Sequence, residues 1–493
     1  MFLFTYESQG SDSDCGGKIL ERKVYNQLNS TLIDELRGIV GAKYVLYDDF
    51  EKMEPYSHDE VVEKRYAHMP DAVVKPRTAA EIAAIMRLAN RENIPVTPRG
   101  AGSGLSGGAV PVCGGILLSL ERMDQILEID KENMVAVVEP GVITNNINTT
   151  LASAGLFFAG YPMSVESCFI GGNVAENAGG GRAVKYGVTG RYIIGLEVVT
   201  PEGEIIHLGG KRVKDVVGYD LIHLMVGSEG TLGIFTKIYI KLLPLPAKKV
   251  NLLVLFADIS TAVAVVPKII TFGKIIPTAV EFMDKTAVEL ACQYLNEHLY
   301  SGEVGAMLLI EIDGSDENQL VHEYEIIGEM CQAAGAIEVY VADNYTTQER
   351  VWAVRRNVPE GIQAAFPIKS SEDLVVPIAC LPELLPKIAE VAAKHDVIIP
   401  CFGHAGDGNI HSTIVKRPEM ANEKWEEAQE LVRAELYRLV LKFGGTISGE
   451  HGIGHKRIKY VRLALDPVTI ALMKRVKKAF DPNEILNPGK MFE

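Results

Sequence analysis

The stretch Pro98-Arg-Gly-Ala-Gly-Ser-Gly-Leu-Ser-Gly-Gly108 sets the interpretation of the whole chain, and its eleven residues include five glycines. Because glycine has no Cβ, such a segment can turn with positive φ and bring backbone N–H groups against an anion, as phosphate-binding loops do. A flexible surface loop is the competing interpretation, since a single glycine-rich run is a weak signal. The rest of the sequence has to decide between the two.

A second glycine-rich stretch, Gly171-Gly-Asn-Val-Ala-Glu-Asn-Ala-Gly-Gly-Gly181, lies too far along the chain to share one βαβ unit with the first. Two such stretches indicate a long ligand that is bound at two places. No helical pattern opens directly after Gly104, so the spacing does not match the Rossmann dinucleotide fingerprint. A third glycine-rich turn, at residues 227–234, follows.

The composition is that of a large globular protein. With 493 residues and 47% apolar content, the chain can bury a sizeable core in two or three domains. The formal net charge of −15 argues against affinity for nucleic acid or anionic membranes, although a local basic pocket for an acidic substrate is compatible with it. The seven cysteines include no CxxC pair, so we expect neither a disulfide framework nor a cysteine-bound iron–sulfur cluster.

Targeting signals are not evident in the sequence. Residues 1–17 lack the basic region of a signal peptide and are expected to be a disordered lead-in. The most apolar region, residues 252–272, is interrupted by Asp258 and Lys268 and is too polar to span a bilayer. These features favour a cytoplasmic protein without a transmembrane segment, peripheral to a membrane only through a partner.

Local patterns predict an α+β protein. We expect a helix over residues 24–45, a helix begun by the capping box Thr78-Ala-Ala-Glu81, and a β-hairpin over residues 195–208. Near Pro244-Leu-Pro246 the sequence pattern changes to alternating strands and long helices. This change predicts a second domain, whose antiparallel sheet is covered on one face by helices. An amphipathic helix is expected over residues 425–443.

Two histidine tracts in the second half are candidates for chemistry: Gly403-His-Ala-Gly-Asp-Gly-Asn-Ile-His411 and Ser448-Gly-Glu-His-Gly-Ile-Gly-His455. Two neutral imidazoles and one carboxylate are a common ligand set for a divalent ion with open coordination positions. His404, His411 and Glu450 are the best candidates for that set. Turn residues that make local hydrogen bonds are the alternative, and the spacing does not decide the metal.

Three further residues are candidates for catalysis. His451, beside Glu450, could serve as a general base. Arg355 and Lys369 could hold a substrate carboxylate, although spacing alone favours solvated surface charges for both.

Together these tracts make the sequence recognisable. It resembles the flavoprotein family of D-lactate dehydrogenases, glycolate oxidase flavin subunits and D-2-hydroxyglutarate dehydrogenases, over nearly all of residues 49–491. Besides the two glycine-rich stretches, the resemblance is carried by Lys214-Asp-Val-Val-Gly-Tyr-Asp-Leu, Gly227-Ser-Glu-Gly-Thr-Leu-Gly-Ile, Gly403-His-Ala-Gly-Asp-Gly-Asn-Ile-His, Gly449-Glu-His-Gly-Ile-Gly and Asp481-Pro-Asn-Glu-Ile-Leu-Asn-Pro-Gly-Lys-Met.

The resemblance implies a fold and a domain order. We expect an N-terminal lead-in and helix at residues 1–48, and an FAD-binding domain of the vanillyl-alcohol-oxidase type with two α+β subdomains at residues 49–246. An α+β cap domain with an antiparallel sheet would follow at residues 247–445. A C-terminal segment, residues 446–493, would return to the FAD domain and complete the active site.

The resemblance also implies FAD, bound without a covalent link because residues 100–108 contain no histidine. The pyrophosphate would lie at the first glycine stretch, and the second and third would border the isoalloxazine. The expected cofactor-binding residues are Pro98, Arg99, Gly100, Ala101, Gly102, Ser103, Gly104, Leu105, Pro162, Ser164, Gly171, Gly172, Asn173, Ala175, Asn177, Gly179, Gly180, Gly233, Ile234 and Asn487.

By the same resemblance His404, His411 and Glu450 would bind Zn, Mn or Fe, and His451 would take the substrate hydroxyl proton. Arg355 matches the carboxylate-binding arginine of the family. Lys369 lies near a second basic position of the family, one residue out of register, and Pro359 and Thr413 also depart from the pattern. These departures bear on substrate identity.

The expected substrate is a small D-2-hydroxycarboxylate, with D-lactate first and glycolate second. The electrons would pass to a separate acceptor, such as an electron-transfer flavoprotein, an iron–sulfur subunit, a quinone or a cytochrome. A glycolate oxidase flavin subunit that is active only within a multi-subunit complex is the alternative, and a homodimer is compatible with either interpretation.

Overall fold

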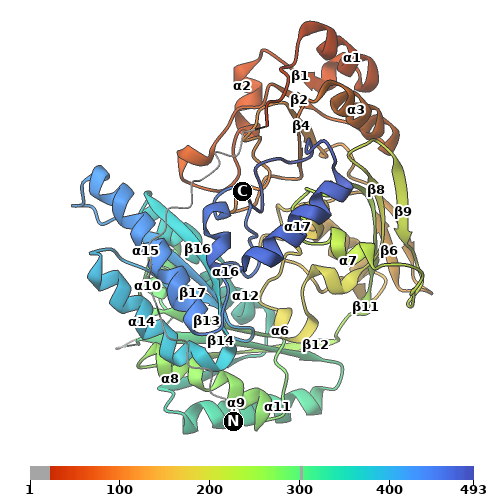
Figure 1. The fold of residues 1–493 in the computed structure, drawn as a ribbon. Coiled ribbons are helices and arrows are strands. Elements are labelled where there is room, and N and C mark those ends of the chain that lie inside the picture. The colour runs from red at the N-terminus through yellow and green to blue at the C-terminus, as the bar shows by residue number, and fades with distance from the viewer. Residues whose placement is uncertain (1–22, 300–303, 493) are drawn as a thin grey trace.

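The computed structural model describes residues 23–299 and 304–492. In these residues the fold contains three sheets of four or more strands (Figure 1). The lead-in expected at residues 1–17 lies outside the described residues. The first sheet has the order β1-β2-β4-β3, with parallel pairs except at β1. Its strands are β1 (Val45–Leu46), β2 (Ala72–Val74), β3 (Val96–Arg99) and β4 (Ile116–Ser119).

The second sheet is antiparallel with the order β5-β6-β10-β8-β9. Its strands are β5 (Ile126–Asp130), β6 (Val135–Val138), β8 (Ile193–Val199), β9 (Ile205–Gly209) and β10 (Ile234–Lys241). The pairing of β8 with β9 confirms the predicted hairpin. Two short strands, β7 (Leu156–Phe157) and β11 (Leu243–Pro244), form a separate antiparallel pair.

Helices of the first half pack on these two sheets, and the one at residues 183–186 also contacts the third sheet (Figure 1). They are α1 (Ser30–Val40), α2 (Phe50–Met53), α3 (Ala79–Glu92), α4 (Thr144–Ala152), α5 (Ile170–Glu176), α6 (Ala183–Tyr186) and α7 (Leu221–Met225). The cap of α3 is as predicted, because Thr78 Oγ1 accepts a hydrogen bond from the N–H of Glu81. The helix predicted over residues 24–45 is shorter, since Asn29 caps α1 at its start and Gly41 follows its last residue.

The third sheet is fully antiparallel with the order β15-β12-β14-β13-β17-β18-β16. Its strands are β12 (Lys248–Phe256), β13 (Ala279–Asp284), β14 (Ala306–Gly314), β15 (Glu338–Ala342), β16 (Lys369–Val375), β17 (Cys401–His404) and β18 (Asn409–Val415). The helices that accompany it are α8 (Ile259–Ala264), α9 (Val266–Thr271), α10 (Lys285–Leu295), α11 (Glu317–Ala333), α12 (Tyr345–Arg356), α13 (Val358–Ala365), α14 (Leu381–Lys394) and α15 (Asn422–Lys442).

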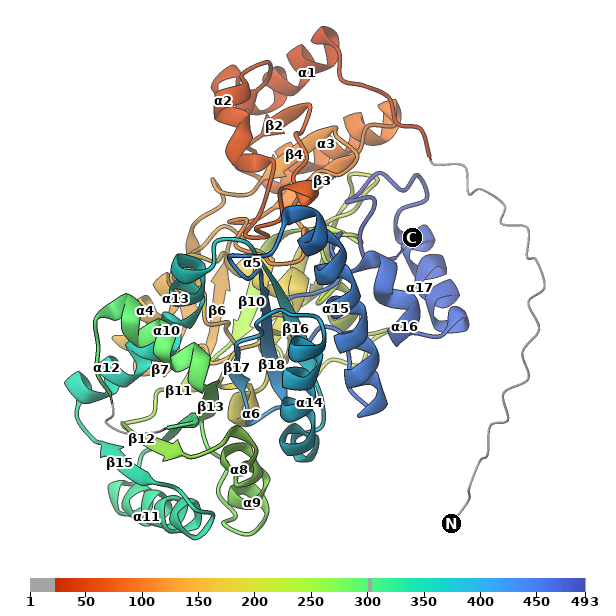
Figure 2. The ribbon, with the colours of Figure 1, turned by 90° about the vertical axis from the view of Figure 1, so that its left-hand side faces the viewer.

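Helices cover both faces of this sheet, so the prediction of a single covered face was wrong (Figure 2). Leu252 and Val254 of β12 face the core that contains α8, α14 and α15, whereas Leu253 and Leu255 face the core that contains α10, α12 and α13. A strand buried on both faces reads as a continuous apolar run without alternation. The run Leu-Leu-Val-Leu-Phe at residues 252–256 is such a signal.

The C-terminal segment returns to the first sheet. After α16 (Val461–Ala464) and α17 (Pro467–Phe480), Leu486 forms a parallel bridge with Val96 of β3. The N–H of Val96 donates to Ile485, and the carbonyl of Val96 accepts from the N–H of Asn487. This return is as expected from the resemblance. No helix in the described part of the chain is both long and apolar enough to cross a bilayer.

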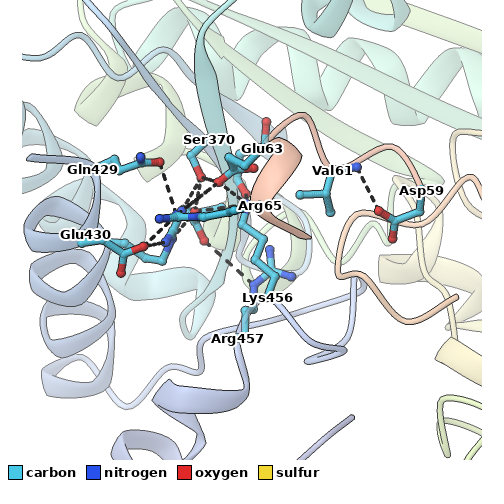
Figure 3. Close-up of polar contacts among 12 residues, drawn as sticks. Asp59, Val61, Glu63, Arg65, Ser370, Gln429, Glu430, Lys456 and Arg457 are labelled. Carbon is cyan, nitrogen blue, oxygen red and sulfur yellow. Dashed lines mark hydrogen bonds and ion pairs between the residues drawn. The ribbon is translucent and has the colours of Figure 1, made fainter. Parts of the chain in front are cut away.

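A buried network of charges joins the first sheet region to the third (Figure 3). The guanidinium of Arg433 on α15 is fully buried, and it contacts Glu372 of β16 at 2.8 Å and Glu63 at 3.0 Å. Lys456 lies 3.4 Å from Glu372 and donates to the carbonyl of Ser371 at 2.7 Å. Segments far apart in sequence therefore meet beside β16 and β18.

Candidate active site

The β17–β18 hairpin places two histidines side by side. In its register His404 is opposite Asn409, and His411 is opposite Phe402. The imidazoles of His404 and His411 have centroids 5.1 Å apart, and both side chains are buried. A tight strand pair thus replaces the helical i, i+4 spacing that other metal sites use.

Glu450, from the loop that follows α15, completes the arrangement. Its Oε1 lies 3.6 Å from His404 Nε2 and 3.4 Å from His411 Nε2, and the two Nε2 atoms are 3.4 Å apart. One donor atom of each residue therefore lies within 4.8 Å of the other two. We call His404, His411 and Glu450 the histidine cluster. Its donor atoms converge as a divalent ion requires.

A buried carboxylate orients His404 from behind. Glu281 of β13 lies 2.7 Å from His404 Nδ1, and its other oxygen lies 2.6 Å from Arg355 Nη2. All three side chains are buried, and the Arg355 guanidinium also lies over the ring of Phe402. A carboxylate on the second nitrogen of a histidine is the usual way to orient a metal ligand.

The electrostatics of the cluster follow from this arrangement. Burial alone would raise the pKa of Glu450, but the charge and hydrogen bond of His404 and the charge of His411 lower it to about 2. Burial opposes protonation of His404, yet Glu281 and Glu450 raise its pKa well above the usual range. Burial lowers the pKa of His411 to about 3. The cluster therefore offers a carboxylate and a neutral imidazole at neutral pH, with His404 as the group that an arriving cation would deprotonate.

His451 lies against the same cluster. Its ring stacks on His411 with centroids 5.3 Å apart, and its Nε2 is 3.7 Å from Glu450 Oε1. On the other side its Nδ1 is 3.9 Å from Asp373 of β16. Burial would raise the pKa of Asp373, but the charges of His451 and His411 keep it well below its usual range.

The three glycine-rich stretches meet in one place, which we call the glycine junction (residues 98–108, 171–181 and 227–234). A Cβ built on Gly100 would lie 3.6 Å from the N of Gly172, and one on Gly230 would lie 2.9 Å from Pro98 Cγ. Asn487 joins them, since its Nδ2 donates to the carbonyls of Gly108 and Glu229. The first half of the second stretch is the short helix α5, where the sequence predicted a glycine loop.

The histidine cluster lies against this junction. A Cβ on Gly179 would come within 3.3 Å of Glu450 Oε2. One on Gly181 would lie 2.2 Å from Glu281 Oε1 and 3.4 Å from His404 Nδ1. A side chain at position 181 would therefore clash with Glu281 of the third sheet, and one at position 179 would be in tight contact with Glu450. Candidate cofactor and candidate metal residues, more than 200 positions apart in sequence, border one site.

The predicted cofactor-binding residues fall into two groups. Partly or fully exposed at the junction are Pro98, Gly100, Ala101, Gly102, Ser103, Gly104, Leu105, Pro162, Ser164, Gly172, Ala175 and Asn177. Buried are Arg99, Gly171, Asn173, Gly179, Gly180, Gly233, Ile234 and Asn487. The Arg99 side chain donates to the carbonyl of His58, and Asn173 donates to Thr144, so these two side chains support the junction from within.

Buried polar atoms at the junction fit the bound cofactor that the stretches predict. Ser106 Oγ, Ser228 Oγ and Asn487 Oδ1 have no hydrogen-bond partner among the described residues. Each comes from a different segment of the junction or from the C-terminal return. Buried polar atoms without a partner are rare, and a ligand is one explanation for such a group. The glycine backbone and these atoms together suit a large polar cofactor.

Lys369 is not brought to the cluster. It lies four residues before Asp373 on β16, about 13 Å along the strand. Its ammonium donates to the carbonyl of Pro359, and burial lowers its pKa. Arg355, by contrast, reaches the cluster through Glu281.

Three carboxylates of the site were not among the sequence candidates: Glu281, Asp373 and Glu229. The sequence does carry a signal for Glu281, because it is a charged residue inside the apolar strand Ala-Val-Glu-Phe-Met. A charged residue that is buried needs a partner, and such a position is a candidate for function.

Two known protein families match consecutive parts of the chain. The FAD binding domain family matches residues 70–209, and the family of the C-terminal domain of FAD linked oxidases matches residues 245–491. The chain is 42% identical to glycolate oxidase subunit GlcD of Bacillus subtilis (strain 168), over 89% of this chain and 92% of that protein. It is 38% identical to D-lactate dehydrogenase of Anaerostipes hadrus, over 95% and 98% of the two chains. D-2-hydroxyglutarate dehydrogenase of Stutzerimonas stutzeri (strain A1501) is 31% identical, over 94% and 98%.

Solved structures with the same fold include two enzymes of low sequence identity. 4-Ethylphenol oxidase from Gulosibacter chungangensis has a TM-score of 0.76 at 19% identity, covering 93% of this chain and 96% of its own. p-Cresol methylhydroxylase has a TM-score of 0.76 at 20% identity, with the same coverage. The predicted fold of the vanillyl-alcohol-oxidase type is confirmed.

Proposed function

We propose that this chain, an oxidoreductase that belongs to the FAD-linked oxidase family, oxidises a D-2-hydroxyacid with the help of FAD and a divalent metal ion. D-Lactate is the first candidate substrate and glycolate the second, in line with the names of the relatives. The observation that carries the proposal is the contact between the histidine cluster and Gly179 and Gly181 of the glycine junction.

His404, His411 and Glu450 would hold the metal, with Zn, Mn and Fe as candidates. Three protein ligands leave coordination positions open for a substrate hydroxyl and carboxylate. A divalent ion held there would supply a Lewis acid that polarises the substrate hydroxyl and lowers the pKa of that hydroxyl. Glu281 supports this role because it orients His404 so that Nε2 faces the other two ligands.

His451 would take the hydroxyl proton on Nε2, the nitrogen that faces Glu450. Its stacking on His411 fixes the plane of the ring beside the metal ligands. A positioned base of this kind contributes about 10²- to 10⁴-fold to a proton transfer.

Arg355 is our candidate for the substrate carboxylate. Its Nε is buried and makes no hydrogen bond within the described residues, so a donor remains beside the cluster. Lys369 was proposed for the same task, but its ammonium is directed to Pro359 and supports that role less well.

Residues of the glycine junction would hold FAD without a covalent link, and the bound flavin would supply the hydride acceptor for oxidation at the substrate α-carbon. Backbone N–H groups of residues 100–105 would bind its pyrophosphate, and Gly179 and Gly180 would border its ring system. Burial of the cluster excludes water from the transfer.

The electrons then pass to a separate acceptor: an electron-transfer flavoprotein, an iron–sulfur subunit, a quinone or a cytochrome. A second candidate function is a flavin subunit that works only within a complex, which the name of the Bacillus relative, a glycolate oxidase subunit, favours. A homodimer is compatible with both.

The test is anaerobic bleaching of bound flavin across a panel of short 2-hydroxyacids of both hands, with metal analysis on the same sample. Bleaching by D-lactate supports a stand-alone dehydrogenase. Bleaching by no member of the panel, alone or with partner subunits, would contradict the proposal.

A further inference from the structure

The loop at residues 448–454 carries both Glu450 and His451, yet none of its residues belongs to a helix or strand. Its side chains are therefore not aimed by regular secondary structure. Successive backbone N–H groups of this loop instead point at buried carboxylates. The positions of these carboxylates explain how the loop is held.

Asp373 holds the first half of the loop. Its Oδ2 accepts from the N–H groups of Gly449, Glu450 and His451 at 2.8, 2.9 and 2.9 Å, and from Ser448 Oγ at 2.8 Å. Consecutive N–H groups that converge on one anion form a nest, here filled by a side chain of the protein itself. Asp373 is opposite His411 in the β16–β18 register, so the nest is attached directly to a strand of the histidine cluster.

Glu229 holds the second half of the loop from the opposite side. Its two carboxylate oxygens accept from the N–H groups of Ile453 at 2.8 Å and Gly454 at 2.6 Å. Glu229 lies in the third glycine stretch, and its own N–H donates to the carbonyl of Ala175 in the second. The anchor is therefore part of the glycine junction.

The loop fits between these anchors only with glycine at two positions. Gly452 and Gly454 have φ of +79° and +53°. A Cβ on Gly452 would lie 2.1 Å from Glu176 Oε2, and one on Gly454 would lie 2.2 Å from the carbonyl oxygen of Ser106. Both the φ values and the close contacts disfavour any larger residue.

We propose that Asp373 and Glu229 act as a carboxylate clamp, a pair of positioning residues that fixes Glu450 and His451 between the histidine cluster and the glycine junction. The proposal rests on the proposed function for its catalytic consequence. Asp373 fixes the position of the loop relative to the histidine cluster, and Glu229 fixes the position of the same loop relative to the glycine junction. Neither carboxylate needs to touch metal, flavin or substrate.

The clamp is tested with D373N and E229Q in the full chain loaded with FAD. Asparagine keeps the shape of Asp373 but turns one acceptor oxygen into a donor, which faces the N–H groups of the loop. Glutamine at position 229 keeps one of two acceptors and is the milder change. D284N is the matched control, because Asp284 is a half-buried carboxylate that also accepts backbone N–H groups, from Ala287 and Cys401.

We expect both variants to lower the rate constant of anaerobic flavin reduction by D-lactate at saturation, by about 10²-fold, because a displacement of about 1 Å is that costly. The substrate concentration for half-saturation should change by less than about threefold, with FAD content and Tm close to those of the wild type. D284N should reduce its flavin at the wild-type rate. Wild-type reduction rates in D373N and E229Q, or a loss that follows FAD content and Tm, would overturn the clamp.

Metal affinity gives a readout that does not depend on the substrate. Mn²⁺ titrated into metal-stripped protein should bind D373N about 10- to 100-fold more weakly than wild type, because Glu450 loses its support. If no 2-hydroxyacid bleaches the wild-type flavin, the proposed function fails. The difference in Mn²⁺ affinity between D373N and wild type still tests the clamp in that case. If D373N does not fold, E229Q carries the kinetic test alone, and unchanged reduction in E229Q would then overturn the proposal.

Discussion

The glycine junction and the histidine cluster border one site but are built by opposite means. The junction is made largely of glycine-rich backbone, and several buried polar atoms there have no partner in the described protein. The cluster is made of side chains on strands, and Glu281 holds His404 through a short contact before any ligand arrives. The difference indicates that the cofactor completes the junction, whereas the cluster is organised by the protein in advance.

Removal of one candidate ligand imidazole should give the largest effect, because it disrupts the histidine cluster directly. H404A should lose bound metal and about 10⁴-fold in turnover, since the ion contributes several kcal/mol to catalysis. Metal content by mass spectrometry and flavin reduction measure the two losses. H207A is the control, because His207 on β9 is mostly exposed. An unchanged metal stoichiometry in H404A would remove His404 from the ligand set.

The candidate base should separate metal binding from chemistry. H451A should keep FAD and metal but reduce its flavin about 10³-fold more slowly, because general-base catalysis is worth about 10²- to 10⁴-fold. Stopped-flow absorbance under anaerobic conditions measures the rate, with H223A at an exposed histidine as the control. Full reductive activity in H451A would refute the assignment.

A methyl group at Gly181 should weaken metal binding while the flavin stays bound. The new Cβ of G181A would lie 2.2 Å from Glu281 Oε1, so Glu281 has to move and His404 loses its orientation. Loss of such support typically costs 10- to 100-fold in metal affinity. Mn²⁺ titration and FAD absorbance report the two sites. G38A is the control, since a Cβ at Gly38 on α1 meets nothing within 4 Å.

The converse change at Gly172 should weaken FAD binding alone. A Cβ there also meets nothing within 4 Å, so G172A should fold normally. It would intrude on the cofactor side of the junction and lower FAD affinity by about tenfold, as a small overpacking does. Wild-type FAD affinity combined with weaker Mn²⁺ binding would reverse the roles that we assign to Gly172 and Gly181.

A further prediction, on stability and not on activity, concerns two carboxylates of the same strand. Arg355 and His404 keep the pKa of Glu281 low despite its burial, whereas burial raises the pKa of Asp284 to about 6. The folded state therefore keeps the proton of Asp284 at pH values where the unfolded chain has lost it. The free energy of unfolding should fall by about 1 to 3 kcal/mol between pH 4 and pH 6 through this group.

In D284N this part of the pH dependence should be absent, because the amide does not titrate. Urea unfolding at several pH values measures it in both proteins. An identical pH dependence of wild type and D284N would show that Asp284 is not protonated in the folded state.

Much of the site could be predicted from sequence because its motifs are local. Glycine-rich stretches and histidines between glycines are unusual enough to be recognised without a fold. Glu281, Asp373 and Glu229 could not be selected in the same way, since a carboxylate in a strand or turn is ordinarily a solvated residue. Their roles depend on partners 78 to 224 positions away, which only the tertiary structure brings near.

The same reasoning explains the outcome for the fold. Capping and hairpin signals were local and were confirmed at Thr78 and in the β8–β9 pair. The faces of the third sheet depend on which helices return to it, and the prediction of one covered face ignored the unbroken apolar run at residues 252–256. The helix expected over residues 24–45 is shorter in the structure, because Asn29 caps α1 at its start and Gly41 follows its last residue.

The central claim is that an ion in the histidine cluster and a flavin at the glycine junction act on one substrate molecule. Its most direct test is anaerobic reduction of bound FAD by D-lactate in protein stripped of metal, followed by addition of Mn²⁺. The account predicts intact yellow protein that is not bleached until the ion is added. Equal bleaching with and without metal, in protein verified to be metal-free, would contradict it.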